Sequence, residues 1–471
     1  MGIRFFSDKN RPVHMGPFPL ENFARGVMPD LATVPPMSAL SFRSQNRDSI
    51  VPAMGEYQAM LDAIRDGLVN KAVADIPSDP IERAQHIKAF GYFNDAAMIG
   101  ICRLPEQALL DAPIVNPDIS RLAEDLKTKQ TKTLASGIDL IMADLRDSME
   151  APPQGIDGHT HAVVFLYQNP RDPKPDEPGS DWIIDAGAHR GALRANETAA
   201  VIGNYIRLLG FDAKSHSMSA TDVDLSRLAV AAGLLWGEGN SLECPVLGRN
   251  FGLAAVTCTL EMAIDQPLAP KSQQSWLKTQ GPSWWLGKGT AKSGLSLDPF
   301  SSRNFKDGPH PFERLKRIET PTTYMDEANI PRVPKRTDMF ARSQFGDMGK
   351  ANQAAAKGGY YARKSAPSFA QRRALGAFVL IQNGDKNLDG PKPNDAQRNA
   401  DNIKAACYFL GVDATGLSRC PEWAWYSHDA AGEAVDPPHD QAISMIIDQG
   451  RETMEGASGD DWIAVAQSMR A

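Results

Sequence analysis

The chain has 471 residues, enough for about three domains of ~150 residues each, and its 42% hydrophobic and 23% charged residues are typical of a globular protein. The net charge of −7 provides no basic field for a nucleic-acid backbone. Apolar stretches are too short to span a membrane, and the N-terminus has neither an apolar core nor twin arginines, so we expect a cytoplasmic protein.

Two segments far apart in the chain carry the same helix-start signal. Asp79 is followed by Pro80 and then Glu82, which is typical of a capped first turn, and the predicted helix runs to Phe93. Asp395 begins a corresponding helix in the second half of the chain.

Between and after these helices, apolar patterns predict further strands and helices. The alternation of the two predicts a mixed α/β (α+β) fold with layers of helix and sheet. The predicted elements are a buried strand over 161–168, a helix over 197–209 closed by Gly210, a helix over 225–232 stopped by Gly233, a long strand over 253–264 and a strand over 442–447. Residues 266–400, rich in Pro, Gly, Lys and Arg, are expected to form an extended connector on the surface, or to be partly disordered.

The five cysteines are too scattered for a metal centre. No C-x-x-C occurs, whereas iron–sulfur clusters and structural zinc need closely spaced thiolates. We therefore expect buried free thiols at Cys102, Cys244, Cys258, Cys407 and Cys420.

The chain repeats itself. Residues 77–106 match 393–422 at twelve of thirty positions without a gap, and three shorter blocks match in the same order. Shared Gly, Pro, Trp and Arg in one order favour a duplication over convergent helix composition. The shorter blocks are 16–25 with 308–317, 34–45 with 333–344, and 179–191 with 459–471.

The repeat predicts two unequal units. Residues 1–270 form a complete first copy, which we call the front unit. Residues 271–390 form an extended connector and arm, in which the second copy's arm starts near 308. Residues 391–471 begin the second copy, the rear unit, which stops at the position aligned with Gly191. Either the rear unit is a half-unit by design or this sequence is cut short.

Three other patterns are weak. His159 and His161 form an H-x-H, but no third metal ligand lies nearby in the sequence. Residues 281–290 (GPSWWLGKGT) depart from a phosphate-binding loop in spacing and in the residue after Lys288. Gly233, Gly237 and Gly239 bracket a turn that a cofactor could approach closely, although tight packing explains them equally.

At residues 205–268 the sequence resembles the cobalamin-binding domain of reductive dehalogenases, with epoxyqueuosine reductase as a distant relative of the same layout. The resemblance lies in IRLLGFDAKSHS, then LAVAAGLLWGEG, then a strand ending in QPL. The rear unit resembles the opening of the catalytic domain in the cytoplasmic, aerobic branch of that family, through GLSRCPEWAWYSHD, AISMIID and EGASGDDWIAVAQSMRA, and RVPKRTDMFARSQFGDMG resembles the arm before it.

The resemblance implies a nitroreductase-related fold with cobalamin-binding units in tandem, the first degenerate and the second incomplete. It implies a corrinoid acting on an organohalide, most readily a halogenated aromatic compound, and a Tyr proton donor assisted by Lys or Arg. It also implies two [4Fe–4S] clusters in a C-terminal module beyond this sequence, which receive electrons from a reductase or ferredoxin. A homodimer is compatible with the resemblance. No nucleic-acid or membrane partner is expected.

The family's Ser and Tyr, four residues apart on one helix, fall on Ser468 and on the position after Ala471. In the front unit the aligned residues are Ala188 and Ala192, and alanine cannot transfer a proton. The assisting cation aligns with the Asn250–Gly252 turn, where only Arg249 lies nearby. The front unit is therefore expected to be non-catalytic.

The aromatic loop with Tyr426 and His428 could line a pocket or simply pack against the protein. No further residue is assigned to binding the cofactor. We expect the N-terminal part of a reductive dehalogenase that is inactive by itself. A non-catalytic corrinoid-binding or scaffold protein is the first alternative, and a nitroreductase-type flavin enzyme is a weaker one.

Overall fold

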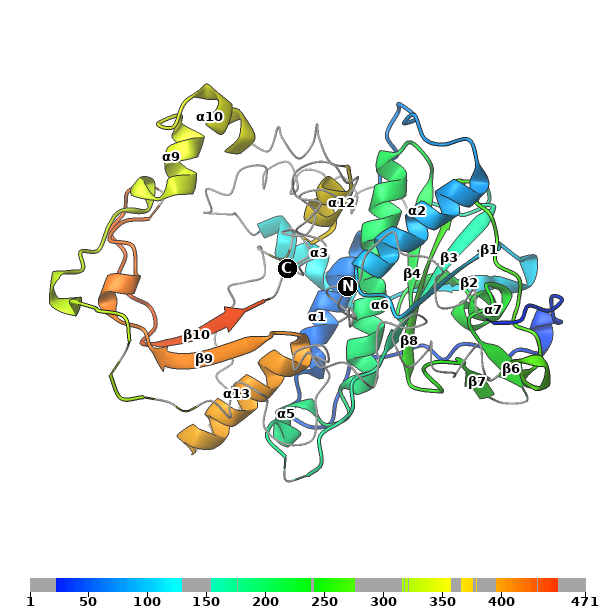
Figure 1. Ribbon diagram of the computed structural model, residues 1–471, viewed down its shortest axis with the longest axis horizontal. Coiled ribbons are helices and arrows are strands. Elements are labelled where there is room, and N and C mark those ends of the chain that lie inside the picture. Colours follow the sequence, from blue (N-terminus) through cyan, green and yellow to red (C-terminus); the bar gives the residue numbers. More distant parts are fainter. Residues whose placement is uncertain are drawn as a thin grey trace, which may run out of the picture.

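The computed structural model describes residues 23–128, 154–175, 177–238, 241–275, 316, 318–320, 322–356, 366–375, 378, 395–429 and 431–447 (Figure 1). Its first half contains α1 (Val51–Ala63), α2 (Pro80–Phe93), β1 (Met98–Arg103), β2 (Leu109–Ile114), α3 (Asp118–Thr128), β3 (His161–Gln168), α5 (Ser180–Ile183), α6 (Gly187–Leu208), β4 (Ala213–Ser217), β5 (Thr221–Val223), α7 (Leu225–Ala231), β6 (Trp236–Glu238), β7 (Ser241–Glu243) and β8 (Phe251–Cys258). Its second half contains α9 (Met339–Phe345), α10 (Lys350–Ala356), α12 (Ala366–Leu375), α13 (Ala396–Leu410), β9 (Ala414–Arg419) and β10 (Gln441–Ile446).

An antiparallel sheet in the order β1-β3-β8-β4 forms the centre of the front unit. Side chains alternate along each strand, so Phe165 faces a core with α2 and α6, whereas Leu166 faces a second core with α7. Helices therefore cover both faces of the sheet, and the predicted mixed helix-and-sheet fold is confirmed.

Two boundaries differ from the sequence prediction by more than a few residues. The strand expected over 253–264 ends at Cys258, because the pairing with both neighbouring strands ends there, opposite His161 and Ala213. The helix expected from residue 197 already begins at Gly187. Its first turn lacks a side-chain cap, so no local signal in the sequence marks this start. Gly210 ends it with a φ of +91°, as expected.

Part of the expected surface connector belongs to the core. Helix α12 packs on α6, where Ala370 and Ala374 are buried in the same apolar cluster as α2. The Asn204 side chain donates to the carbonyl oxygen of Ala370 (3.0 Å), and Gln371 donates to Asn94 (2.8 Å). The expectation of an extended connector is therefore wrong for this segment.

The elements that the sequence repeat aligns have the same order and the same strand register. Asp79 and Asp395 cap α2 and α13 by accepting hydrogen bonds from first-turn amides. Strand β1 pairs with β3, and β9 pairs with β10, in antiparallel ladders. Met98 lies opposite Leu166 in the first ladder, and Ala414, its counterpart in the repeat, lies opposite Ile446 in the second.

The two strand pairs lie apart in the molecule. Figure 1 shows the β9–β10 hairpin away from the four-stranded sheet, with α13, α5 and α1 between them. None of the helices in the described part of the chain has both the length and the apolar composition to cross a membrane.

Candidate functional site

The front-unit position aligned with Ser468 and its expected Tyr lies in the first turns of α6. Ala188 is exposed there, and Ala192 is buried in an apolar cluster with Ile183 and Leu193. Neither side chain can hold or transfer a proton. Ser468 itself lies outside the described residues, as do Gly239 and the 281–290 segment.

Backbone packing fills the space beside Ala192. A Cβ atom on Gly252 would lie 2.2 Å from the carbonyl carbon of Gly191, and one on Gly191 would lie 1.9 Å from Asn169 Oδ1. The Asn250 side chain donates to the carbonyl oxygen of Asn169 (3.2 Å), which fixes the turn before β8. Helix α6 and β8 therefore meet at glycine on both sides, with no room for a side chain between them.

The aromatic loop packs against the arm that precedes it. The Tyr426 hydroxyl donates to Asp338 (2.9 Å), the Lys335 ammonium lies 4.9 Å from the centre of its ring, and Arg332 donates to its carbonyl oxygen (2.7 Å). The backbone of His428 accepts a hydrogen bond from the Lys335 amide (2.9 Å). These contacts give the loop a packing role.

The H-x-H pair does not act as one unit. The His159 ring contacts Thr257 (2.7 Å), whereas the His161 ring contacts Thr160 (2.8 Å). Among the residues that the structure describes, no three His, Cys, Asp or Glu side chains converge as metal ligands would. All five cysteines are free thiols, buried at three positions and half-buried at Cys407 and Cys420.

Gly233 is explained by packing. Its φ is +66°, and a Cβ atom there would lie 2.3 Å from both the Arg25 guanidinium and the carbonyl oxygen of Gln266. Arg25 also donates to the Gly233 carbonyl oxygen (3.2 Å).

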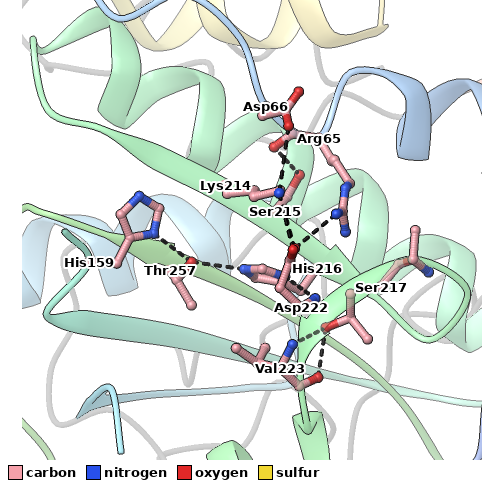
Figure 2. Close-up of polar contacts among 12 residues, drawn as sticks. Arg65, Asp66, His159, Lys214, Ser215, His216, Ser217, Asp222, Val223 and Thr257 are labelled. Carbon is pink, nitrogen blue, oxygen red and sulfur yellow. Dashed lines mark hydrogen bonds and ion pairs between the residues drawn. The ribbon is translucent and has the colours of Figure 1, made fainter. Parts of the chain in front are cut away.

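A buried polar cluster links the edge strand β4 to the neighbouring strand β8 and to Arg65 and Asp222 (Figure 2). Thr257 Oγ1 lies 2.8 Å from His216 Nε2 and contacts His159 on its other side. Asp222 pairs with Lys214 (3.2 Å) and Arg65 (2.9 Å).

Burial lowers the pKa of His216 well below its usual value, and the positive charges of Arg65 and Lys214 act in the same direction. Burial also lowers the pKa of His159, and nearby Asp212 opposes that shift. Because Thr257 and His216 have no exposed surface, this His–Thr–His arrangement is closed to a substrate and is structural.

A second buried polar centre was missed by the sequence analysis. Asp62 in α1 accepts five hydrogen bonds, from the side chains of Gln58, Asn116, Asn196, Ser217 and Ser219, at 2.6–3.1 Å. Burial raises its pKa, and these hydrogen bonds oppose the rise. The signal in the sequence was the four-residue spacing of Met54, Gln58 and Asp62, which places two polar residues on the apolar stripe of a helix.

Comparison with solved structures gives a match over the whole chain. Catabolic reductive dehalogenase NpRdhA is 34% identical to this chain with a TM-score of 0.77, covering 100% of this chain and 61% of that one. Its structure in complex with 3-bromo-4-hydroxybenzoic acid matches equally well. A reductive dehalogenase structure described as suggesting a mechanism for B12-dependent dehalogenation covers 99% of this chain, also at 34% identity.

Other comparisons add little. An epoxyqueuosine reductase from Bacillus subtilis aligns at 10% identity with a TM-score of 0.25, too low to support an argument. No protein-family model and no curated protein matches the chain. The chain is thus a relative of the reductive dehalogenases along its entire length, and it spans about three fifths of the solved members that it matches.

Proposed function

We propose that this chain is the N-terminal part of an enzyme that removes halide from an organohalide, with halogenated aromatic compounds as the substrate class. The observation that carries the proposal is the 34% identity to a reductive dehalogenase over the entire chain, together with a TM-score of 0.77. A structure of that relative in complex with a brominated hydroxybenzoic acid supports the substrate class.

The reaction replaces halogen by hydrogen, so it consumes two electrons and one proton and releases halide. Bound cobalamin would supply the strong reductant that cleaves the carbon–halogen bond, which no side chain provides. Within this chain, Ser468 is the residue proposed to face the substrate, and the Tyr expected after Ala471 would supply the proton. The electrons would come from a ferredoxin or reductase through two iron–sulfur clusters outside this sequence.

The two units have different proposed roles. Residues 1–270 are a non-catalytic copy, because Ala188 and Ala192 hold no proton and the Gly191–Gly252 contact fills the space beside Ala192. Residues 271–390 are a connector and arm, and residues 391–471 begin the catalytic unit. The shared register of the β1–β3 and β9–β10 ladders supports an origin by duplication.

Halide release by the full-length protein encoded by the gene tests this function. Loaded with cobalamin and supplied with a low-potential electron donor, it should release bromide from 3-bromo-4-hydroxybenzoic acid, and residues 1–471 alone should release none. A full-length protein that binds cobalamin but releases no halide from a panel of halogenated aromatic compounds would contradict the proposal. Reduction that depends on FMN would instead support the flavin alternative, and a gene that stops at codon 471 would support the scaffold alternative.

A further inference from the structure

Helix α13 of the rear unit lies against α5 and the first turns of α6 in the front unit (Figure 1). The Asp181 carboxylate in α5 accepts two hydrogen bonds from the Arg398 guanidinium, at 2.5 and 2.6 Å, and a third from the Asn402 amide at 3.1 Å. At the other end of α13, the Arg190 guanidinium donates to the carbonyl oxygen of Leu410 (2.5 Å). Polar contacts therefore hold both ends of the helix.

Apolar contacts fill the space between these ends. Ala405, Ala406 and Phe409 of α13 are buried in one cluster with Ile183 and Ala192 of the front unit. Gly179, with a φ of +86°, permits the close approach, because a Cβ atom there would lie 2.5 Å from the Cβ of Ala405. The first turns of α6 thus help to hold another helix.

The repeat contains a second helix, α2, in which the residue aligned with Arg398 has the opposite charge. Arg398 and Asn402 of α13 align with Glu82 and His86 of α2. A carboxylate at position 82 would repel Asp181, whereas the Arg398 guanidinium pairs with it in a bidentate geometry. The His86 ring is already bound to the Tyr205 hydroxyl (2.8 Å).

We propose that α5 and the first turns of α6 form a docking surface that selects α13 of the rear unit, and that the Asp181–Arg398 pair determines this selection. The proposal rests on the duplication in the proposed function and goes beyond it. The first turns of α6 align with the proposed catalytic position of the rear unit. In the front unit, these turns instead help to position the rear unit by holding α13. A charge that attracts one copy of the helix and repels the other gives the selection.

Hydrogen–deuterium exchange of the full-length protein encoded by the gene tests the proposal. Arg398→Glu gives α13 a carboxylate at the position where α2 carries Glu82, and the amides of residues 396–410 should then exchange about fivefold faster through local opening. Because the Arg398 side chain is 66% exposed, the loss of the ion pair alone would have a small effect on exchange. The new repulsion between Glu at position 398 and Asp181 is the main cause of the faster exchange. Asp181→Arg should have the same effect, and the double variant with both changes should regain protection.

Arg336→Glu is the matched control, because it breaks a similarly exposed bidentate pair with Asp347 in the arm. It should leave the exchange of residues 396–410 unchanged. Asp181→Asn provides a milder variant if charge reversal impairs folding, with a smaller increase in exchange expected. Unchanged exchange in Arg398→Glu, or a double variant that exchanges as fast as the single ones, would overturn the proposal without bearing on halide release.

Discussion

The α2–β1–β3 and α13–β9–β10 segments share their helix caps and strand register but not their surroundings. Strand β3 is buried along nearly its whole length between α6 and α7, with β8 pairing at its second edge. Strand β10 leaves Ile443, Met445 and Ile446 exposed at 48%, 57% and 62%.

This difference shows that a segment's own sequence specifies its helices and strands, whereas neighbouring elements determine how deeply they are buried. Local signals, such as an Asp cap and a short apolar run, produce the same helix and the same strands twice. Burial comes from α6, α7 and β8, which pack on the β1–β3 pair and have no counterpart packed on the β9–β10 pair within the described ranges. Most of the stabilising apolar contact is therefore expected in the front unit.

A pair of aligned glycines gives the largest expected contrast between the units. A Cβ atom on Gly100 in β1 would lie 2.4 Å from the carbonyl oxygen of Ala232, whereas nothing lies within 4 Å of one on Gly416 in β9. Gly100→Ala should lower the free energy of unfolding by ~2–3 kcal/mol because it overpacks the second core. Its matched control, Gly416→Ala, should change that free energy by less than ~0.5 kcal/mol.

Urea unfolding of the two variants measures the contrast. Similar losses in both would show that the two strands are equally packed, which would contradict the difference between the units.

A smaller effect is expected from pH, and it should originate in the front unit. Burial lowers the pKa of His216 and His159, so below about pH 6.5 the unfolded chain binds protons that the folded chain does not. The free energy of unfolding should therefore fall as the pH drops below 6.5, by at most ~1.4 kcal/mol per pH unit for each imidazole.

Thermal unfolding between pH 5 and 7.5 tests this dependence. His216→Gln should be less stable at pH 7 but less sensitive to acid. An unaltered slope in His216→Gln would exclude His216 as its source.

The sequence was sufficient where local chemistry decides the structure. The capped starts at Asp79 and Asp395, the buried strand over 161–168 and the helix ends before Gly210 and Gly233 all follow from short patterns, and the structure contains them. The family resemblance also came from ordered motifs, which the match over the whole chain confirms.

Long-range contacts determine the element boundaries and the packing that the sequence did not predict. The end of β8 at Cys258 depends on where β3 and β4 begin, and α12 is buried through its packing on α6 and the hydrogen bond between Asn204 and Ala370. The Asp181–Arg398 pair joins residues more than two hundred positions apart. No periodicity or cap records such contacts, so the sequence could not predict them.

The central claim is that the rear unit carries catalysis while the front unit, with alanine at the aligned position, does not. Reciprocal variants of the full-length protein test it most directly, through kcat/KM for bromide release from 3-bromo-4-hydroxybenzoic acid. Ser468→Ala should lower kcat/KM about tenfold, equivalent to ~1.4 kcal/mol, and Ala188→Ser should change it less than twofold. An active enzyme that is indifferent to Ser468→Ala but impaired by Ala188→Ser would contradict the assignment of the two units.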